Sequence, residues 1–365
     1  MIICSRFPEA SRTHSTVPGA WRGEPVTSPI PTAPTPSLIA APPPSTTEDL
    51  RLALRAATLY YLDGMTQAEV ATRLGVSRPT AGRLVARARA QGLVRIEVQA
   101  PAHLRDALRS DEERALEEKF GLLEAVVVAD SVDATGSIDD HNSFAGVGRA
   151  AASLLVRRIR EGDTLGFTWG PETVAVAQGL PSGAATCASV VQLDGAVSAI
   201  NYQTGTEYVL GRCAEQLQAN TVRLPVPLYA DASTVVSMRG DSVISKALEA
   251  GRTAEMMMFG TGAVSTSTTL FEGSFIDTDM LSVLTGLGAV GEVGGRFYRL
   301  DGTEVGGPLD ERAMSVPLDD IRACGGSILV TGGVAKHQAA LGALHGGLAK
   351  MLVCDIECAR WLLDQ

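Results

Sequence analysis

Residues 162–180 read GDTLGFTWGPETVAVAQGL, and this stretch carries the local signature of an α/β fold. An apolar run at 164–168 leads into a turn that contains Gly170, and small and apolar residues at helical spacing follow the turn. A strand that passes through a short glycine turn into a helix is the building unit of a parallel sheet. The stretch predicts one such unit, and the rest of the chain repeats it.

Other apolar stretches alternate with helical stretches in the same rhythm. They lie at residues 124–130, 189–195, 222–229, 255–260, 326–333 and 350–355. Short glycine-rich turns follow several of them, as in the quoted stretch. This alternation predicts a doubly wound, mostly parallel α/β domain over residues 121–365.

Residues 65–98, MTQAEVATRLGVSRPTAGRLVARARAQGLVRIEV, predict two helices, a tight turn between them and a short strand at 93–98. Thr66 is followed three residues later by Glu69, which is the spacing of a capping box at a helix start. Ser77 is a good N-cap for the second helix. The pattern is typical of a helix-turn-helix, winged-helix-like domain, which we place at residues 46–100.

The second helix of this pattern would enter the major groove of DNA through its first turn. Residues 46–100 carry a net charge of +3, whereas residues 101–365 carry −14, so the cationic part of the chain is small. The residues expected to contact DNA are Thr66, Gln67, Ser77, Arg78, Thr80, Arg83 and Arg87, with Ala81 beside them. The alternative is a structural three-helix unit with surface arginines. One such unit covers only a half-site, which implies an oligomer.

Residues 1–45 hold ten of the 18 prolines, which indicates a disordered tail, either a docking segment or, more simply, a solvated extension. Residues 101–120 form an amphipathic stretch that we interpret as a linker or oligomerisation helix. No apolar run approaches the roughly 20 residues of a membrane helix, and the N-terminus lacks a signal sequence, so we expect a cytoplasmic protein. The six scattered cysteines fit reduced thiols, and no metal or cofactor site is expected.

Residues 50–365 resemble the SorC/DeoR-type family of sugar-binding transcriptional regulators. The stretches that carry the resemblance are 65–98, 162–180, 256–268, 288–302 and 331–363, in this order. The resemblance implies a helix-turn-helix joined to an effector domain that looks like phosphosugar isomerases. It also implies a tetramer that binds operator DNA, represses transcription and is controlled by a phosphorylated sugar or polyol.

The effector would bind at the glycine-rich turns that end the strands, where backbone N–H groups and hydroxyls can hold a phosphate. The residues expected there are Thr168, Gly170, Thr173, Gln192, Asp194, Gly260, Thr261 and Gly262. The resemblance adds Glu292 and Lys336, since an acidic residue and a lysine at these places face the effector in the family. For each of these residues the alternative is a structural turn or a surface polar group.

One departure from the family pattern concerns the phosphate. The family pattern resembles Ser-Trp-Gly-x-Thr, whereas this chain reads Thr-Trp-Gly-Pro-Glu-Thr, one residue longer, with Glu172 added. A carboxylate beside a phosphate is unfavourable unless it points away. The departure therefore leaves two alternatives, a changed phosphate position or an effector that carries less charge.

Lys336 is one of only four lysines, and its chemistry can be narrowed from its neighbours. The stretch 331–338, TGGVAKHQ, lacks the spacing of a nucleotide P-loop, and His337 stands where that loop has Ser or Thr. A Schiff-base lysine needs a lowered pKa, whereas a nearby Glu292 would favour the charged form. A charged lysine that reaches sugar oxygens or phosphate is the favoured interpretation, and a reversible imine with an open-chain sugar stays open.

Three functions compete at this point. The main hypothesis is a repressor of a carbohydrate or polyol catabolic operon that a phosphorylated sugar controls allosterically. The second is a phosphosugar isomerase or deaminase fused to a DNA-binding domain, and the third is a constitutive DNA-binding protein. Because no convincing acid and base pair flanks the turns, we expect no enzyme activity and name no catalytic residue.

Overall fold

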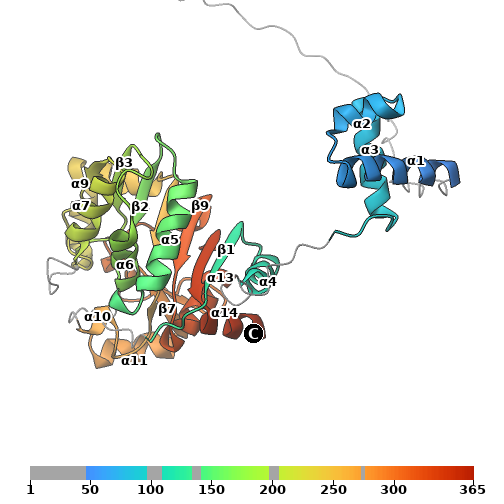
Figure 1. The fold of residues 1–365 in the computed structure, drawn as a ribbon. Helices are drawn as coiled ribbons and strands as arrows, with labels where there is room; N and C mark the ends of the chain where they lie inside the picture. The colour runs from blue at the N-terminus through green and yellow to red at the C-terminus, as the bar shows by residue number, and fades with distance from the viewer. Residues whose placement is uncertain (1–46, 97–108, 134–140, 197–204, 273–275) are drawn as a thin grey trace, which may run out of the picture. The chain divides into compact units, whose positions relative to one another are not determined.

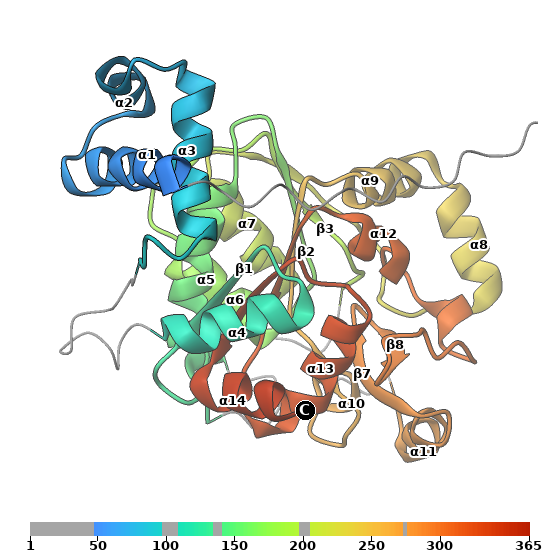
Figure 2. The same ribbon diagram turned by 90° about the vertical axis from the view of Figure 1, so that its right-hand side faces the viewer.

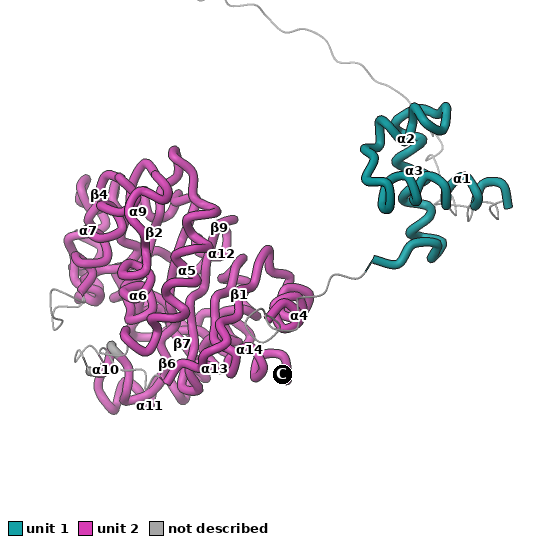
Figure 3. Tube along the Cα trace, viewed as in Figure 1, with its two compact units in different colours: residues 1–97 teal, residues 98–365 magenta. Residues whose placement is uncertain are grey.

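The computed structural model describes residues 47–96, 109–133, 141–196, 205–272 and 276–365. The chain divides into two compact units, residues 1–97 and residues 98–365 (Figure 3). The tail expected at 1–45 lies outside the described residues.

The first unit is built from helices (Figure 1). Its elements are α1 (Thr47–Ala57), which continues into one π-helical turn, η1 (Thr58–Leu62), then α2 (Gln67–Leu74) and α3 (Arg78–Ala90). Gly75 adopts a φ of +68° at the end of α2, a backbone conformation that glycine reaches without strain, and the chain turns there into α3. The core consists mainly of small side chains, with Ala53, Ala56, Ala81 and Ala88 fully buried. Small residues let the three helices approach closely.

The strand expected at 93–98 is absent from the part that the structure describes. Residues 93–96 follow Gly92, which has a φ of +69°, and they form no strand, while residues 97–98 lie outside the described residues. The alternating apolar pattern of 93–98 predicted a strand, but in the described residues no partner strand pairs with it.

The second unit contains a seven-stranded sheet in which every pairing is parallel. The strand order is β1-β10-β9-β5-β2-β3-β4. The strands are β1 (Glu124–Val128), β2 (Thr164–Phe167), β3 (Ser189–Gln192), β4 (Asn220–Val222), β5 (Met256–Phe259), β9 (Gly326–Val330) and β10 (Met351–Asp355). The strand expected at 222–229 is misplaced, because β4 spans Asn220–Val222. The prolines at 225 and 227 lack a backbone N–H group, so the strand does not continue through them.

Helices cover both faces of this sheet, which confirms the doubly wound architecture. One face carries α5 (Ala145–Arg158), α6 (Pro171–Gly179) and α7 (Thr206–Gln216), as Figure 1 shows. The other face carries α4 (Ser110–Phe120), α12 (Leu318–Ala323), α13 (His337–His345) and α14 (Ile356–Asp364), several of which are in front in Figure 2. Helices α5 and α6 touch at Gly148, where a Cβ atom would lie 2.6 Å from the carbonyl carbon of Ala175.

The remaining elements lie around the sheet. They are α8 (Ala232–Gly240), α9 (Ser242–Arg252), α10 (Thr269–Glu272) and α11 (Thr278–Gly286), with a small antiparallel sheet of β6 (Gly262–Ala263), β7 (Ala289–Val293) and β8 (Arg296–Arg299). Glu292, which the family resemblance added to the expected site, lies inside β7 and is paired with Gly262 on β6. The antiparallel sheet thus brings Glu292 to the end of β5.

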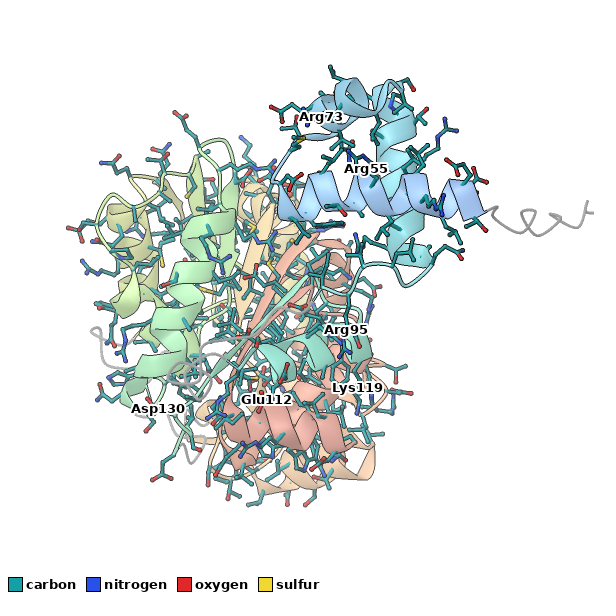
Figure 4. The ribbon with its side chains drawn as sticks, turned by 45° about the vertical axis from the view of Figure 1, so that its right-hand side comes forward. Arg55, Arg73, Arg95, Glu112, Lys119 and Asp130 are labelled. Atoms are coloured by element: carbon teal, nitrogen blue, oxygen red, sulfur yellow. The ribbon has the colours of Figure 1, made fainter. Side chains whose placement is uncertain are left out.

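Helix α4, the described part of the expected 101–120 linker helix, packs on the α/β unit. Glu117 and Glu113 accept hydrogen bonds from the backbone N–H groups of Ala125 (2.9 Å) and Val127 (3.0 Å) on β1. Lys119, labelled in Figure 4, donates to the carbonyl of Leu363 on α14 (3.0 Å). Helix α4 is therefore fixed to the edge strand β1 and to α14, and it is part of the effector unit.

The sheet has one topological switch point. The chain runs from β2 outward to β3 and β4 on one side, and from β5 outward to β9 and β10 on the other. The connections after β2 and β5 diverge, which leaves a crevice at the carboxyl ends of these two neighbouring strands, where open α/β sheets bind ligands. The N–H of Thr168 donates to the carbonyl of Met258 (3.1 Å) and ties the two strand ends together.

Candidate effector pocket and DNA-binding surface

A pocket occupies this crevice. Its wall comes from the turn after β2, the turn after β5, strand β7 and the turn after β9. Seven predicted residues line it together: Thr168, Gly170, Gly260, Thr261, Gly262, Glu292 and Lys336. Segments that are far apart in the sequence thus meet at the place that the fold reserves for a ligand.

The charged centre of the pocket is an ion pair between Lys336 and Glu172. The Nζ atom of Lys336 donates to Oε1 of Glu172, and both side chains are almost fully buried, at 5% and 2% exposed. Nζ also lies 5.3 Å from the ring centre of Phe144, a cation–π contact. The partner that the sequence suggested, Glu292, lines the same pocket, but Lys336 makes its contact with Glu172.

Glu172 therefore points into the pocket and not away from it. It is the second residue of α6, after Pro171, so its carboxylate lies at the N-terminus of that helix. Its Oε2 atom is packed against backbone, because a Cβ atom on Gly260 would lie 2.6 Å from it and one on Gly170 would lie 3.0 Å from it. The absence of side chains at these two glycines makes the room for the carboxylate.

Glu292 is the second buried carboxyl group of the pocket. Its Oε2 accepts a hydrogen bond from the N–H of Gly295 (2.7 Å), and a Cβ atom on Gly262 would clash with Oε1. Burial raises the pKa of Glu292 to about 7, a shift that the Gly295 hydrogen bond and Lys336 reduce and that Glu172 increases. Near neutral pH this carboxyl group can accept or donate hydrogen bonds.

Thr261 presents a polar atom that the protein leaves without a partner. Its side chain is 1% exposed and lines the pocket, and its Oγ1 atom makes no hydrogen bond within the described residues. A buried hydroxyl without a partner is unfavourable, so its environment calls for a ligand or solvent group that completes it.

Three predicted effector residues are not part of the pocket wall. Thr173 donates from Oγ1 to the carbonyl of Gly170 (2.9 Å) and stabilises the first turn of α6. Gln192 accepts a hydrogen bond from the N–H of Leu224 (2.9 Å) and fixes the segment after β4. Asp194 accepts from the N–H of Trp169 with both oxygens (3.2 and 3.1 Å), and its burial raises its pKa. These residues support the wall from behind.

The sequence missed five lining residues: Trp169, Pro171, Ala263, Thr268 and Gly294. Glu172 was considered only as an unfavourable neighbour of a phosphate and not as a lining residue. The signal for Glu172 was present in the departure of 168–173 from the family pattern. Nothing in the sequence marked Thr268, whose Oγ1 donates to the carbonyl of Ser265 (3.1 Å) and closes a turn.

A buried carboxylate holds the turn that carries Lys336. Asp355 is fully buried at the N-cap of α14, where Oδ1 accepts from the N–H of Cys358 (2.7 Å). Its Oδ2 accepts from the N–H groups of Val132 (2.7 Å) and Gly333 (3.0 Å). Asp355 thereby links the turn after β9 to two other segments and positions Lys336 indirectly.

On the first unit, the start of α3 presents the cations expected at DNA. Ser77 caps the helix by accepting from the N–H of Thr80 (3.3 Å), and the two hydroxyls lie 2.8 Å apart. Arg83 donates to Oγ1 of Thr80 (3.3 Å), and both Arg78 and Arg83 are exposed. Together these residues form a polar, cationic end of α3.

Four other expected contacts are placed differently. Thr66 uses its backbone N–H and its hydroxyl on the Glu69 carboxylate (2.7 and 2.8 Å), so both donors serve the capping box. Gln67 lies against α3 near Gly82, where a Cβ atom would be 3.3 Å from its Oε1. Arg87 faces Asp49 on α1 at 3.8 Å. Ala81 is fully buried, so it belongs to the core and cannot face bases.

The described residues offer neither a metal site nor a membrane span. Across residues 47–96, 109–133, 141–196, 205–272 and 276–365, no group of three or more His, Cys, Asp and Glu side chains could hold a metal ion. No helix in these same ranges is both long enough and apolar enough to cross a membrane.

Comparisons with known proteins agree with both units. Residues 107–364 match the family described as a sugar-binding domain, and residues 56–105 match the MarR family. The deoxyribonucleoside regulator of Bacillus subtilis is 33% identical over 319 residues, which cover 87% of this chain and 98% of that protein. The sorbitol operon regulator of Klebsiella pneumoniae is 27% identical over 321 residues, with coverage of 87% and 98%.

A solved structure supports the same assignment. The full-length sorbitol operon regulator SorC from Klebsiella pneumoniae superposes with a TM-score of 0.64 at 26% identity, over 87% of this chain and 100% of that one. The helix-turn-helix, the doubly wound sheet and the similarity over nearly the full length of these regulators all indicate the same family. The chain therefore belongs to the SorC/DeoR-type family of sugar-binding transcriptional regulators.

Proposed function

We propose that this protein represses a carbohydrate or polyol catabolic operon and releases its operator when a sugar or polyol binds in the pocket between β2 and β5. The observation that carries the proposal is the pocket itself. A buried ion pair, a second carboxyl group and the unpartnered Oγ1 of Thr261 meet at the switch point of a unit that is joined to a helix-turn-helix. The family resemblance favours a phosphorylated effector.

The assembly we propose is a cytoplasmic homotetramer, as the family resemblance implies. One α3 helix reads only a half-site, so tight operator binding requires at least two. Ligand binding changes DNA affinity only if it favours one of two arrangements of the subunits. We infer that helix α4, fixed to β1 and α14, transmits this change from the sheet toward the DNA-binding units.

An enzymatic role has less support. An isomerase or deaminase needs an acid and a base that flank the sugar. Lys336 and Glu172 neutralise each other, and Glu292 is the only other titratable group of the described pocket wall. His337 stacks on Trp361, with ring centres 5.0 Å apart, and lines a different pocket. We therefore assign the pocket to ligand sensing.

The test is an electrophoretic mobility shift with the DNA upstream of the protein's own operon. We expect the full-length protein to shift this DNA, and a panel of sugars, polyols and their phosphate esters to contain compounds that weaken the shift. If no compound alters the shift, the protein binds DNA constitutively and the proposal is wrong. Turnover of any phosphosugar by the protein would support the enzymatic alternative instead.

The DNA-binding surface has its own variant in this assay. Arg83→Ala removes an exposed cation at the start of α3, and we expect at least about a tenfold loss of operator affinity, as for one good base or phosphate contact. Arg51→Ala removes another exposed cation, on α1, where it pairs with Glu48, and serves as the control. Equal losses in both variants would indicate a diffuse charge effect and contradict the assignment of α3.

A further inference from the structure

The wall of the effector pocket already contains an anion of its own at the position where a phosphate would be held. The N-terminus of a helix that follows a glycine turn attracts phosphate groups through free N–H groups and the helix dipole. Helix α6 offers such an N-terminus after Gly170, but the carboxylate of Glu172 lies there, packed against the backbone of Gly260. A phosphate at this position would have to displace a buried side chain.

The cation that would bind a phosphate is also occupied. Lys336 is the only lysine or arginine of the described pocket wall, and it donates to Glu172. Separating this ion pair leaves a buried carboxylate without its cation, which is strongly unfavourable. With Glu292 as a second carboxyl group, the wall carries one cation and two acids, so a phosphate dianion would meet repulsion.

The groups that remain free suit hydroxyls. Oγ1 of Thr261 lacks a partner within the described residues, and Glu292 has only its Oε2 atom occupied, by the N–H of Gly295. A hydroxyl group can donate to the Glu292 carboxylate and accept from Thr261, or the reverse if Glu292 is protonated. A polyhydroxy compound would therefore complete the unpaired polar atoms and add no charge.

We propose that the effector is an uncharged polyhydroxy compound, a polyol or an unphosphorylated sugar, and that Glu172 excludes phosphate esters by occupying the anion position beside Lys336. This inference rests on the proposed function, because it names the ligand class of the same pocket. It differs from the expectation that the family resemblance gave. The glycines at 260 and 262 fit this role, since any side chain there would collide with the two carboxyl groups.

The test compares matched compounds that differ only in a phosphate group. Calorimetry on the full-length protein measures binding of erythritol, ribitol, sorbitol and 2-deoxyribose and of the phosphate ester of each. We expect at least one free compound to bind and its ester to bind at least about tenfold more weakly. We also expect inorganic phosphate in excess to leave the affinity for the free compound unchanged.

Glu172→Gln frees Lys336 and removes one acid while keeping the size of the side chain. We expect the affinity for the ester to rise at least about tenfold in this variant, and the variant to bind inorganic phosphate. The double variant E172Q/K336M should bind neither ester nor phosphate, because the cation is gone. Glu215→Gln, an exposed site on α7, is the control and should behave as the wild type.

The outcomes separate the inference from the function on which it rests. An ester that binds the wild type more tightly than its free compound and weakens operator binding overturns the inference and leaves the proposed function intact. Binding of inorganic phosphate by the wild type in competition with a free compound overturns the inference as well, even if Glu172→Gln fails to fold. If neither member of any pair binds or alters operator binding, both the inference and the proposed function are wrong.

Discussion

Glu172 and Lys336 depend on each other, because neither charge would be stable in this crevice alone. Each is almost fully buried; Glu172 lies in the first turn of α6, after β2, and Lys336 lies in the segment between β9 and α13. A buried ion pair adds little net stability compared with apolar residues, but loss of one partner is costly. We interpret the pair as a device that fixes the shape and charge of the pocket.

The single substitution Lys336→Met should therefore lower the free energy of unfolding by about 3–5 kcal/mol, since it leaves the Glu172 carboxylate buried and unpaired. The double variant E172Q/K336M should recover most of this loss. Urea denaturation of the wild type, both single variants and the double variant gives the coupling between the two residues. Additive effects of the two substitutions would show that the ion pair does not form in solution.

Glu292 should make stability depend on pH. Its pKa is raised from 4.5 to about 7, so between these values the folded protein binds a proton that the unfolded chain has released. This contribution is complete below the unfolded pKa and is lost as pH rises through about 7. Compared with Glu292→Gln, the wild type should lose on the order of 2–3 kcal/mol between about pH 5 and about pH 8.

Thermal or urea unfolding of the wild type and of Glu292→Gln across this pH range measures the difference in stability. The contributions of titratable groups that both proteins share cancel in this difference. A difference between wild type and variant that does not change with pH would mean that Glu292 titrates normally and is solvated. Its position opposite Gly262 in the antiparallel sheet would then be wrong.

At the residue scale, the sequence predicted which residues line the pocket better than it predicted which of them contact one another. Glycines and threonines at strand ends predicted five of the lining positions, because turn chemistry is local, and the family resemblance added Glu292 and Lys336. The partner of Lys336 could not be predicted, since Glu172 and Glu292 are both distant in sequence and only the strand order decides which carboxylate is nearer. The orientation of Glu172 depends on the missing side chain at Gly260, a contact between segments about 90 residues apart.

At the scale of elements, the turn between β9 and α13 depends on one side chain of the next strand. Asp355→Asn replaces one acceptor oxygen by a donor, so at least one of the N–H groups of Val132, Gly333 and Cys358 loses its partner. We expect about 2–4 kcal/mol lower stability, since hydrogen bonds to a charged, buried acceptor are strong. The affinity for the effector should fall in parallel, because Gly333 begins the turn that carries Lys336.

Asp364→Asn is the control, because Asp364 lies at the exposed C-terminal end of α14, the helix that Asp355 caps. It should change neither the stability nor the affinity for the effector. Urea denaturation and calorimetry with the effector supply the two measurements. If Asp355→Asn lowered stability but left effector affinity unchanged, the carboxylate would support the fold and would have no part in positioning Lys336.

The elements that the sequence predicted best are those with strong local signals. Strands β2, β3, β5, β9 and β10 are continuous apolar runs that end in glycine or polar turns, and all five lie within predicted stretches. The antiparallel strands β6 to β8 escaped prediction because they are short and carry glycine or charged residues among their apolar ones, so no continuous apolar run marks them. The strand prediction for residues 93–96 was wrong for the opposite reason, since these residues show a strand pattern but have no partner strand in the described residues.

At the scale of the whole molecule, the proposed tetramer can be measured directly. Sedimentation velocity of the full-length protein should give a species of four chains, each of 38.1 kDa. Two half-sites separated by whole turns of DNA should be needed for tight binding, so a change of about five base pairs between them should weaken it. A monomer that binds operator as tightly as any larger species would contradict the assembly.

The pairing of the edge strand β1 with its neighbour β10 imposes an order on folding during synthesis. Strand β1 pairs in the sheet only with β10, which the ribosome makes more than 200 residues later, and Asp355 at the end of β10 also fixes Val132 and the turn after β9. Long-range parallel pairing of this kind folds slowly and exposes apolar strands in the meantime. The helix-turn-helix, made of local contacts, can fold first. A nascent regulator can thus acquire its DNA-reading unit well before it acquires the unit that senses the metabolite.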